Sequence, residues 1–132
     1  MSDKRFVTAV NCMDGRVQLP VISWLKQEYH AEYIDMITEP GPIKILAENK
    51  PEYLVDSLKK RIEISVLKHG STAIAVIGHF DCAGNPVEKE IQKQQIEKSI
   101  IRIESWGFNR PVIGLWVDEN WKVHKVFSQT YV

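Results

Sequence analysis

Residues 72–84 read TAIAVIGHFDCAG, and this stretch determines how the rest of the chain can fold. It opens with an almost continuously apolar run, which is typical of a strand buried on both faces of a parallel sheet. A histidine and a cysteine, His79 and Cys82, follow this run directly and are separated by two residues. Chemically reactive side chains therefore stand at the end of a predicted central strand.

Segments typical of strands and of helices alternate along the chain. Short runs rich in β-branched or aromatic residues predict strands over residues 5–11, 31–38, 71–78 and 111–117. Longer segments with apolar residues at helical spacing predict helices over residues 19–30, 51–70 and 86–107. The flanking residues agree with these boundaries. Pro51 and Pro86 suit first helical positions, Asn85 suits the N-cap of the third helix, and His69 with Gly70 suits a helix end.

This alternation predicts an α/β fold of three layers, α/β/α, with a mostly parallel sheet and strand order 2-1-3-4. Strand-like runs flank Asp118, Glu119 and Asn120, so we expect a hairpin that adds an antiparallel C-terminal edge strand. A single domain spanning residues 1–132 fits this length. In such a sheet, ligands bind beyond the carboxyl ends of the strands.

The composition and charge of the chain indicate what kind of partner it binds. Lys plus Arg and Asp plus Glu number 17 each, and no segment is strongly basic. We therefore expect a small molecule or another copy of the chain as partner, and no nucleic acid or membrane. The N-terminus lacks the regions of a signal peptide, and no apolar run approaches the ~18 residues of a membrane span. These features predict a cytoplasmic protein, in which two cysteines are metal ligands, catalytic thiols or inert core residues rather than a disulfide.

The candidate metal site combines both cysteines with one histidine. Cys12 follows the first predicted strand, whereas His79 and Cys82 follow the third, so neighbouring strands would bring the three side chains together. Two thiolates and one imidazole suit tetrahedral Zn²⁺, and three protein ligands leave a fourth position open, as in catalytic zinc sites. We therefore predict a zinc site made of these three residues.

Asp14 and Arg16 follow Cys12 in the motif CMDGR and are the predicted catalytic residues. Asp14 could orient a zinc-bound water while Arg16 holds it in a bidentate pair away from the metal. If Arg16 swings away, Asp14 could instead occupy the fourth coordination position and close the site. Alternatively, the two residues form only a loop-stabilising pair or a helix-start interaction. Two further acids have alternative roles: Asp81 is a partner of a ligand or a turn residue, and Glu39 faces the site or the solvent.

The motifs CMDGR (12–16) and HFDC (79–82), on this alternation of strands and helices, resemble the β-class carbonic anhydrase family. In that family, Cys-x-Asp-x-Arg and His-x-x-Cys supply the zinc ligands and an aspartate–arginine dyad, and zinc-bound hydroxide attacks carbon dioxide to give bicarbonate. The resemblance thus implies the ligands and the dyad already named, and reversible hydration of carbon dioxide as the reaction. It also implies a homodimer or a larger homo-oligomer.

The sequence departs from the family pattern in three places. The first strand is predicted to begin by about Arg5, which leaves no counterpart of the helical arm that wraps a neighbouring subunit in the family. TEPGP (38–42) replaces an Asn-Ala-Gly-Asn type turn, and Ala83 replaces a glycine. Two alternatives therefore stay open: a catalytically silent zinc-binding protein with a structural or regulatory role, and a zinc hydrolase acting on another small electrophile.

Overall fold

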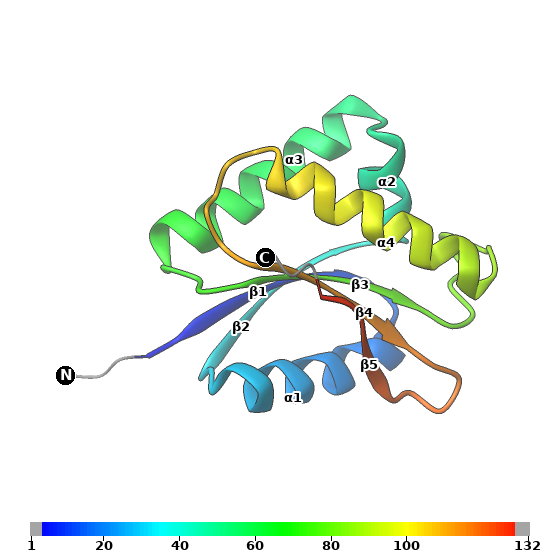
Figure 1. The fold of residues 1–132 in the computed structure, drawn as a ribbon, viewed down its shortest axis with the longest axis horizontal. Helices are drawn as coiled ribbons and strands as arrows, with labels where there is room; N and C mark the ends of the chain where they lie inside the picture. Colours follow the sequence, from blue (N-terminus) through cyan, green and yellow to red (C-terminus); the bar gives the residue numbers. More distant parts are fainter. Residues whose placement is uncertain (1–3, 129–132) are drawn as a thin grey trace.

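The protein folds as a five-stranded sheet between two layers of helices (Figure 1). The structure is a computed structural model that describes residues 4–128, apart from the side chains of residues 127 and 128. Along the chain, the elements are β1 (Phe6–Cys12), the 3-10 turn η1 (Gly15–Val17), α1 (Gln18–Tyr29), β2 (Tyr33–Glu39), α2 (Pro42–Glu48), α3 (Glu52–Glu63), the π-helical turn η2 (Ile64–Lys68), β3 (Ile74–His79), α4 (Lys89–Glu104), β4 (Val112–Val117) and β5 (Val123–Ser128). Within residues 4–128, no helix is both long and apolar enough to span a bilayer.

The strand order is β2-β1-β3-β4-β5, which confirms the predicted order and the antiparallel edge strand. β1 pairs in parallel with β2 and β3, and β3 pairs in parallel with β4. Every residue of β3 is buried, as its apolar sequence predicts for a central strand. The carboxyl ends of β1 and β3 therefore lie at the same edge of the sheet, where the candidate metal site was expected.

Each face of the sheet has its own apolar core. α2, α3 and α4 cover one face and α1 covers the other, so the sheet is enclosed on both sides (Figure 1). On the first face, isoleucines of α4 pack against residues of β3 and of α2 and α3: they are Ile96, Ile100 and Ile103. On the second face, Val21 and Leu25 of α1 pack against Ala75 and Ile77 of β3. This double burial holds the strand that carries His79 from both sides.

The structure contains one helix that the sequence patterns above do not predict. α2 begins directly after the TEPGP stretch, with Gly41 at its N-cap and Pro42 at its first position. Gly41 has a φ of 61°, which turns the chain out of β2, and Pro42 has the φ that a first helical residue needs. With only seven residues, α2 is too short to show a helical period in the sequence.

The predicted start of the third helix is wrong by three residues. α4 begins at Lys89 rather than Pro86, and Glu88 is its N-cap. Asn85, predicted as the cap, is buried, and its Nδ2 donates a hydrogen bond to Oε1 of Gln95 at 2.6 Å. A tertiary contact therefore holds the polar side chain that the sequence pattern assigns to a helix end.

The hairpin between β4 and β5 contains a hydrogen-bonded aspartate, Asp118, that should make the stability of the protein depend on pH. The Asp118 carboxylate accepts hydrogen bonds from Nε2 of His124 at 2.7 Å and from the backbone N–H groups of Lys122 and Asn120. These contacts, His124 first, lower the pKa of Asp118 to about 2. The ordinary aspartate pKa is about 3.9, so this stabilisation is present above about pH 4 and is lost as the pH falls toward 2. We expect His124→Ala to raise the pKa of Asp118 and to flatten the loss of stability over this range.

Carboxyl-carbon NMR titration of Asp118 and urea unfolding at several pH values would measure both effects. An Asp118 pKa that stays unchanged in the variant would contradict the assignment of His124 as the main cause.

Candidate metal centre

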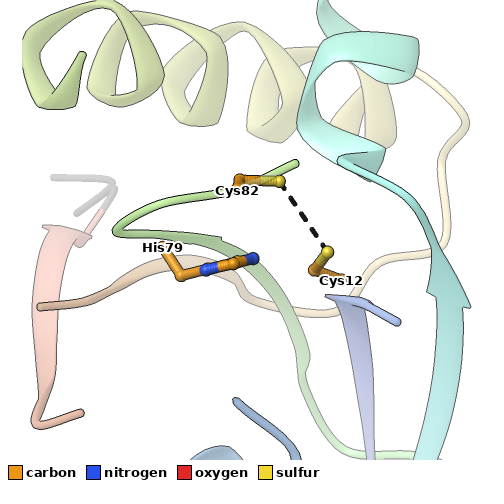
Figure 2. Close-up of side chains that lie close together, drawn as sticks. All are labelled: Cys12, His79 and Cys82. Atoms are coloured by element: carbon orange, nitrogen blue, oxygen red, sulfur yellow. Dashed lines mark hydrogen bonds between the residues drawn. The ribbon is translucent and has the colours of Figure 1, made fainter. Parts of the chain in front are cut away.

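Cys12, His79 and Cys82 meet at the carboxyl edge of the sheet. Cys12 is the last residue of β1, His79 is the last residue of β3, and Cys82 lies in the loop that follows β3. The two Sγ atoms are 3.8 Å apart, and one ligand atom from each of the three residues lies within 4.8 Å of the others. Figure 2 shows the three side chains converging from these elements. The predicted ligands are thus brought together.

All three side chains are sealed from solvent. Cys12 and Cys82 are each 4% exposed and His79 is 1% exposed. The His79 ring has one satisfied nitrogen, because Nδ1 lies 2.8 Å from the carbonyl oxygen of Phe80. Its other nitrogen, Nε2, is buried and has no hydrogen-bond partner among the described residues. An unpartnered buried imidazole nitrogen beside two sulfurs fits a metal ion, because Nδ1–H donating to a carbonyl leaves Nε2 as a free electron-pair donor.

The charges of the site also suit a cation. Donation from the Cys82 thiol lowers the pKa of Cys12; burial opposes this, and His79 and the backbone N–H of Gly41 reinforce it. The neighbouring Cys12 thiolate and burial both raise the pKa of Cys82. Burial alone would lower the pKa of His79, but contact with Cys12 makes the net change a rise. These shifts favour loss of a proton from Cys12, and a divalent cation would stabilise both sulfurs as thiolates.

The turn between β2 and α2 packs tightly against the loop after β3. A Cβ atom on Gly41 would lie 2.7 Å from the Cβ of Asn85, and one on Gly84 would lie 2.7 Å from the Cβ of Pro40. Neither glycine leaves room for a side chain. The TEPGP turn and the shift of the glycine from position 83 to position 84 are therefore linked. Gly84 lets this turn approach the loop that carries Cys82.

Asp14 and Arg16 form a bidentate ion pair beside the three predicted ligands. Nε of Arg16 lies 3.0 Å from Oδ1 of Asp14, and Nη2 lies 2.7 Å from Oδ2. Hydrogen bonds from Arg16 lower the pKa of Asp14 to about 2, and the same pair raises the pKa of Arg16. Among the described residues, Asp14 is outside the group of ligand atoms within 4.8 Å of one another. Arg16 thus holds the carboxylate as an anion, and this ion pair is the contact that both alternatives for Asp14 and Arg16 require.

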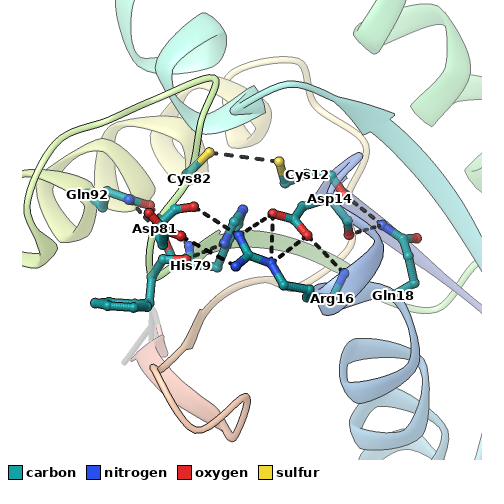
Figure 3. A network of polar contacts seen from close by, with 9 residues as sticks. Cys12, Asp14, Arg16, Gln18, His79, Asp81, Cys82 and Gln92 are labelled. Carbon is teal, nitrogen blue, oxygen red and sulfur yellow. Dashed lines mark hydrogen bonds and ion pairs between the residues drawn. The ribbon is translucent and has the colours of Figure 1, made fainter.

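Two residues from other elements hold Arg16 in turn. Nη2 of Arg16 donates to the carbonyl oxygen of Asp81 at 3.1 Å, and Nη1 lies 3.4 Å from its carboxylate. The guanidinium also lies over the Trp121 ring, 4.6 Å from the centroid. Asp81 has a positive φ of 61° and is therefore a turn residue that also contacts the dyad. Figure 3 shows this network around Arg16, with Asp14 on one side and Asp81 on the other.

Glu39 neither faces the metal site nor points freely into solvent. Its carboxylate pairs with Arg61 of α3, and its backbone carbonyl accepts a hydrogen bond from Met13 at 3.1 Å. Both alternatives considered from the sequence are thus replaced by a contact that ties the end of β2 to a helix. Sequence spacing alone could not reveal it, because 22 residues separate the partners.

The family of this chain follows from its sequence as a whole. The sequence model of a family described as "Putative carbonic anhydrase" matches residues 2–127. The chain belongs to this carbonic anhydrase family. The resemblance predicted from the motifs CMDGR and HFDC is thereby confirmed. No curated protein matches the sequence.

Solved β-carbonic anhydrases share the fold of this carbonic anhydrase family member. The β-carbonic anhydrase isoform I from the protozoan Trichomonas vaginalis superimposes with a TM-score of 0.60 at 15% sequence identity, covering 98% of this chain and 87% of that one. A β-carbonic anhydrase from the filamentous ascomycete Sordaria macrospora, described as tetrameric, gives a TM-score of 0.54 at 10% identity, covering 95% and 81%. Identities this low show a common fold and nothing more.

Sequence reasoning missed two glutamines that support this carbonic anhydrase-like site. Nε2 of Gln18 donates to the carbonyl oxygens of Cys12 at 2.8 Å and Asp14 at 3.1 Å, which fixes the loop between them. Gln92 of α4 binds the backbone of His79. Gln18 could have been suspected from its position two residues after CMDGR, whereas Gln92 lies 13 residues from its partner on a predicted amphipathic helix.

Proposed function

We propose that this chain is a zinc-dependent lyase of the carbonic anhydrase type, which reversibly hydrates carbon dioxide to bicarbonate. Cys12, His79 and Cys82 are the proposed zinc ligands. The observation that carries the proposal is Nε2 of His79, which is buried without a hydrogen-bond partner among the described residues and lies beside the sulfurs of Cys12 and Cys82. Two sulfurs and one imidazole nitrogen favour zinc over hard cations such as Mg²⁺, which prefer oxygen ligands.

The chain's own residues have separate roles in this proposal. When bound, zinc supplies a Lewis acid that makes a water molecule a stronger nucleophile near neutral pH. The Cys12 and Cys82 thiolates balance the charge of the ion. Asp14 accepts a hydrogen bond from the reacting water and orients it, and Arg16 keeps Asp14 ionised and directed away from the ligands. Asp14 and Arg16 are therefore the proposed catalytic residues.

The experiment is a measurement of zinc content followed by stopped-flow hydration of carbon dioxide by the zinc-loaded protein. We expect close to one zinc per chain and a rate above that of buffer. Absence of zinc after reconstitution would rule out the metal site. Zinc without hydration would favour a catalytically silent zinc-binding protein. Turnover of carbonyl sulfide, carbon disulfide or an activated ester without carbon dioxide hydration would favour a zinc hydrolase.

We further propose that copies of the chain associate as a homodimer or a larger homo-oligomer. Support comes from the tetrameric state of the Sordaria macrospora proteins and from exposed apolar side chains close to the site, of which Met13 is 61% and Phe80 47% exposed. Light scattering that gives the mass of one chain across the working concentration range would refute this.

A further inference from the structure

A buried glutamine holds the backbone of the histidine at the metal centre. Nε2 of Gln92 donates to the carbonyl oxygen of His79 at 2.9 Å, and the backbone N–H of His79 donates to Oε1 of Gln92 at 3.1 Å. Gln92 is 1% exposed and lies on the face of α4 that packs against the sheet. Figure 3 shows its amide directed at the backbone of His79 at the end of β3. One side chain thus satisfies both backbone groups of a candidate metal ligand.

The position of this contact follows from the shape of the sheet. The β1–β3 pairing extends only from Thr8 and Ile74 to Val10 and Val76, so β1 no longer pairs with β3 near His79. The next residue, Phe80, donates its N–H to β4. Because successive backbone groups of a strand face opposite neighbours, the N–H and carbonyl of His79 face the side that β1 has left. Gln92 supplies the hydrogen bonds that a paired strand would otherwise make.

A glycine beside His79 makes room for this arrangement. A Cβ atom on Gly78 would lie 2.8 Å from Oε1 of Gln92 and 2.9 Å from Cδ1 of Ile43. Any side chain at position 78 would therefore displace either the amide of Gln92 or the α2 residue beside it. The glutamine and the glycine form a matched pair that lets α4 reach the backbone of β3.

We propose that Gln92 is a positioning residue for metal binding, which fixes the His79 peptide so that Nε2 points at the two sulfurs. The inference rests on the proposed function, because it assigns Gln92 to the same site. With the peptide held, Nδ1 of His79 stays bonded to the carbonyl of Phe80, and the ring keeps the orientation that directs Nε2 at the two sulfurs. Gln92 acts on the site through the backbone of His79, and its Nε2 also lies 3.4 Å from the carbonyl oxygen of Val87 in the loop that follows β3.

The main test replaces Gln92 with leucine, which is similar in size and makes neither hydrogen bond. Loss of a hydrogen-bonded partner of a metal ligand weakens metal binding by about 10- to 100-fold, and we expect a change of this order in the zinc Kd measured by chelator competition. The control is Ser99→Ala, which removes another buried hydrogen bond of α4, from Oγ of Ser99 to the carbonyl of Ile43 at 3.1 Å. The control should lose thermal stability but keep its zinc Kd within about threefold, because Ser99 bonds the backbone of Ile43 in α2 and none of the three proposed ligands.

If Gln92→Leu folds poorly, a second variant and a measurement on metal-free protein can still test the role of Gln92. Gly78→Ala should displace the Gln92 amide and also weaken zinc binding. In metal-free protein, amide-exchange NMR should show the backbone N–H of His79 protected from solvent exchange by its hydrogen bond to Gln92, and this protection should be lost in either variant. Retention of both the wild-type zinc Kd and the protected His79 amide by the variants would overturn the proposal, as would equal loss of affinity in Ser99→Ala. A wild-type protein that binds no zinc would instead refute the proposed function, and the NMR result would still decide the role of Gln92.

Discussion

Zinc-reconstituted Cys82→Ser protein is expected to retain almost no zinc after gel filtration, whereas the wild type retains close to one ion per chain. The Cys82 sulfur lies 3.8 Å from that of Cys12, and its removal leaves one sulfur and one imidazole nitrogen. A serine hydroxyl stays protonated near neutral pH and cannot replace a thiolate. The loss of affinity should exceed the about 10- to 100-fold effect of losing an outer partner such as Gln92.

The measurement is zinc content by mass spectrometry, with circular dichroism to verify folding. Asp81→Asn is the matched control, because Asp81 lies in the same loop, one residue from Cys82, and its carboxylate is 67% exposed and contacts Arg16. The control should bind zinc like the wild type. Stoichiometric zinc in Cys82→Ser would exclude Cys82 as a ligand.

Asp14→Ala is expected to lower the rate of carbon dioxide hydration by about 10- to 100-fold while zinc content stays unchanged. The Asp14 carboxylate accepts hydrogen bonds from the backbone N–H of Arg16 at 2.9 Å and from its guanidinium, the shortest at 2.7 Å, and lies outside the cluster of ligand atoms. Its proposed work is therefore to orient the reacting water. Loss of that orientation affects the rate and leaves the affinity for the metal intact.

Stopped-flow hydration and zinc analysis on the same preparation separate three possibilities for Asp14. A lower rate with full zinc supports the orienting role. A lower zinc affinity accompanied by a higher rate would mean that Asp14 occupies the fourth coordination position and closes the site. Unchanged rate and zinc content would leave Asp14 and Arg16 as a loop-stabilising pair. Asp81→Asn again serves as the control, because it removes a contact to Arg16 and leaves the bidentate pair in place.

The sequence predicted the elements with the strongest local patterns and missed those that depend on contacts. β3 was identifiable because a buried parallel strand is apolar throughout. α2 was not, because two turns of helix after Pro-Gly-Pro carry too few residues for a period. Asn85 looked like a helix cap because its side chain suits that role, but the partner that holds it, Gln95, is half-buried in the following helix. A local sequence pattern indicates which structural position suits a side chain. A competing tertiary contact decides which hydrogen bonds that side chain makes.

By itself, the sequence determined the fold class, the strand order and the identity of the three side chains that meet at the carboxyl edge of the sheet. It could do so because strand and helix periods are local, and parallel strands joined by helices must deliver their ends to one edge. Only the tertiary structure decided which contacts fix the positions of the residues at that edge. The contacts to Arg16 from Trp121, the glycines that fit the β2–α2 turn against the metal loop, and the Gln92 amide on His79 all join residues far apart in sequence. Such contacts depend on packing distances between elements, which no local pattern of residues encodes.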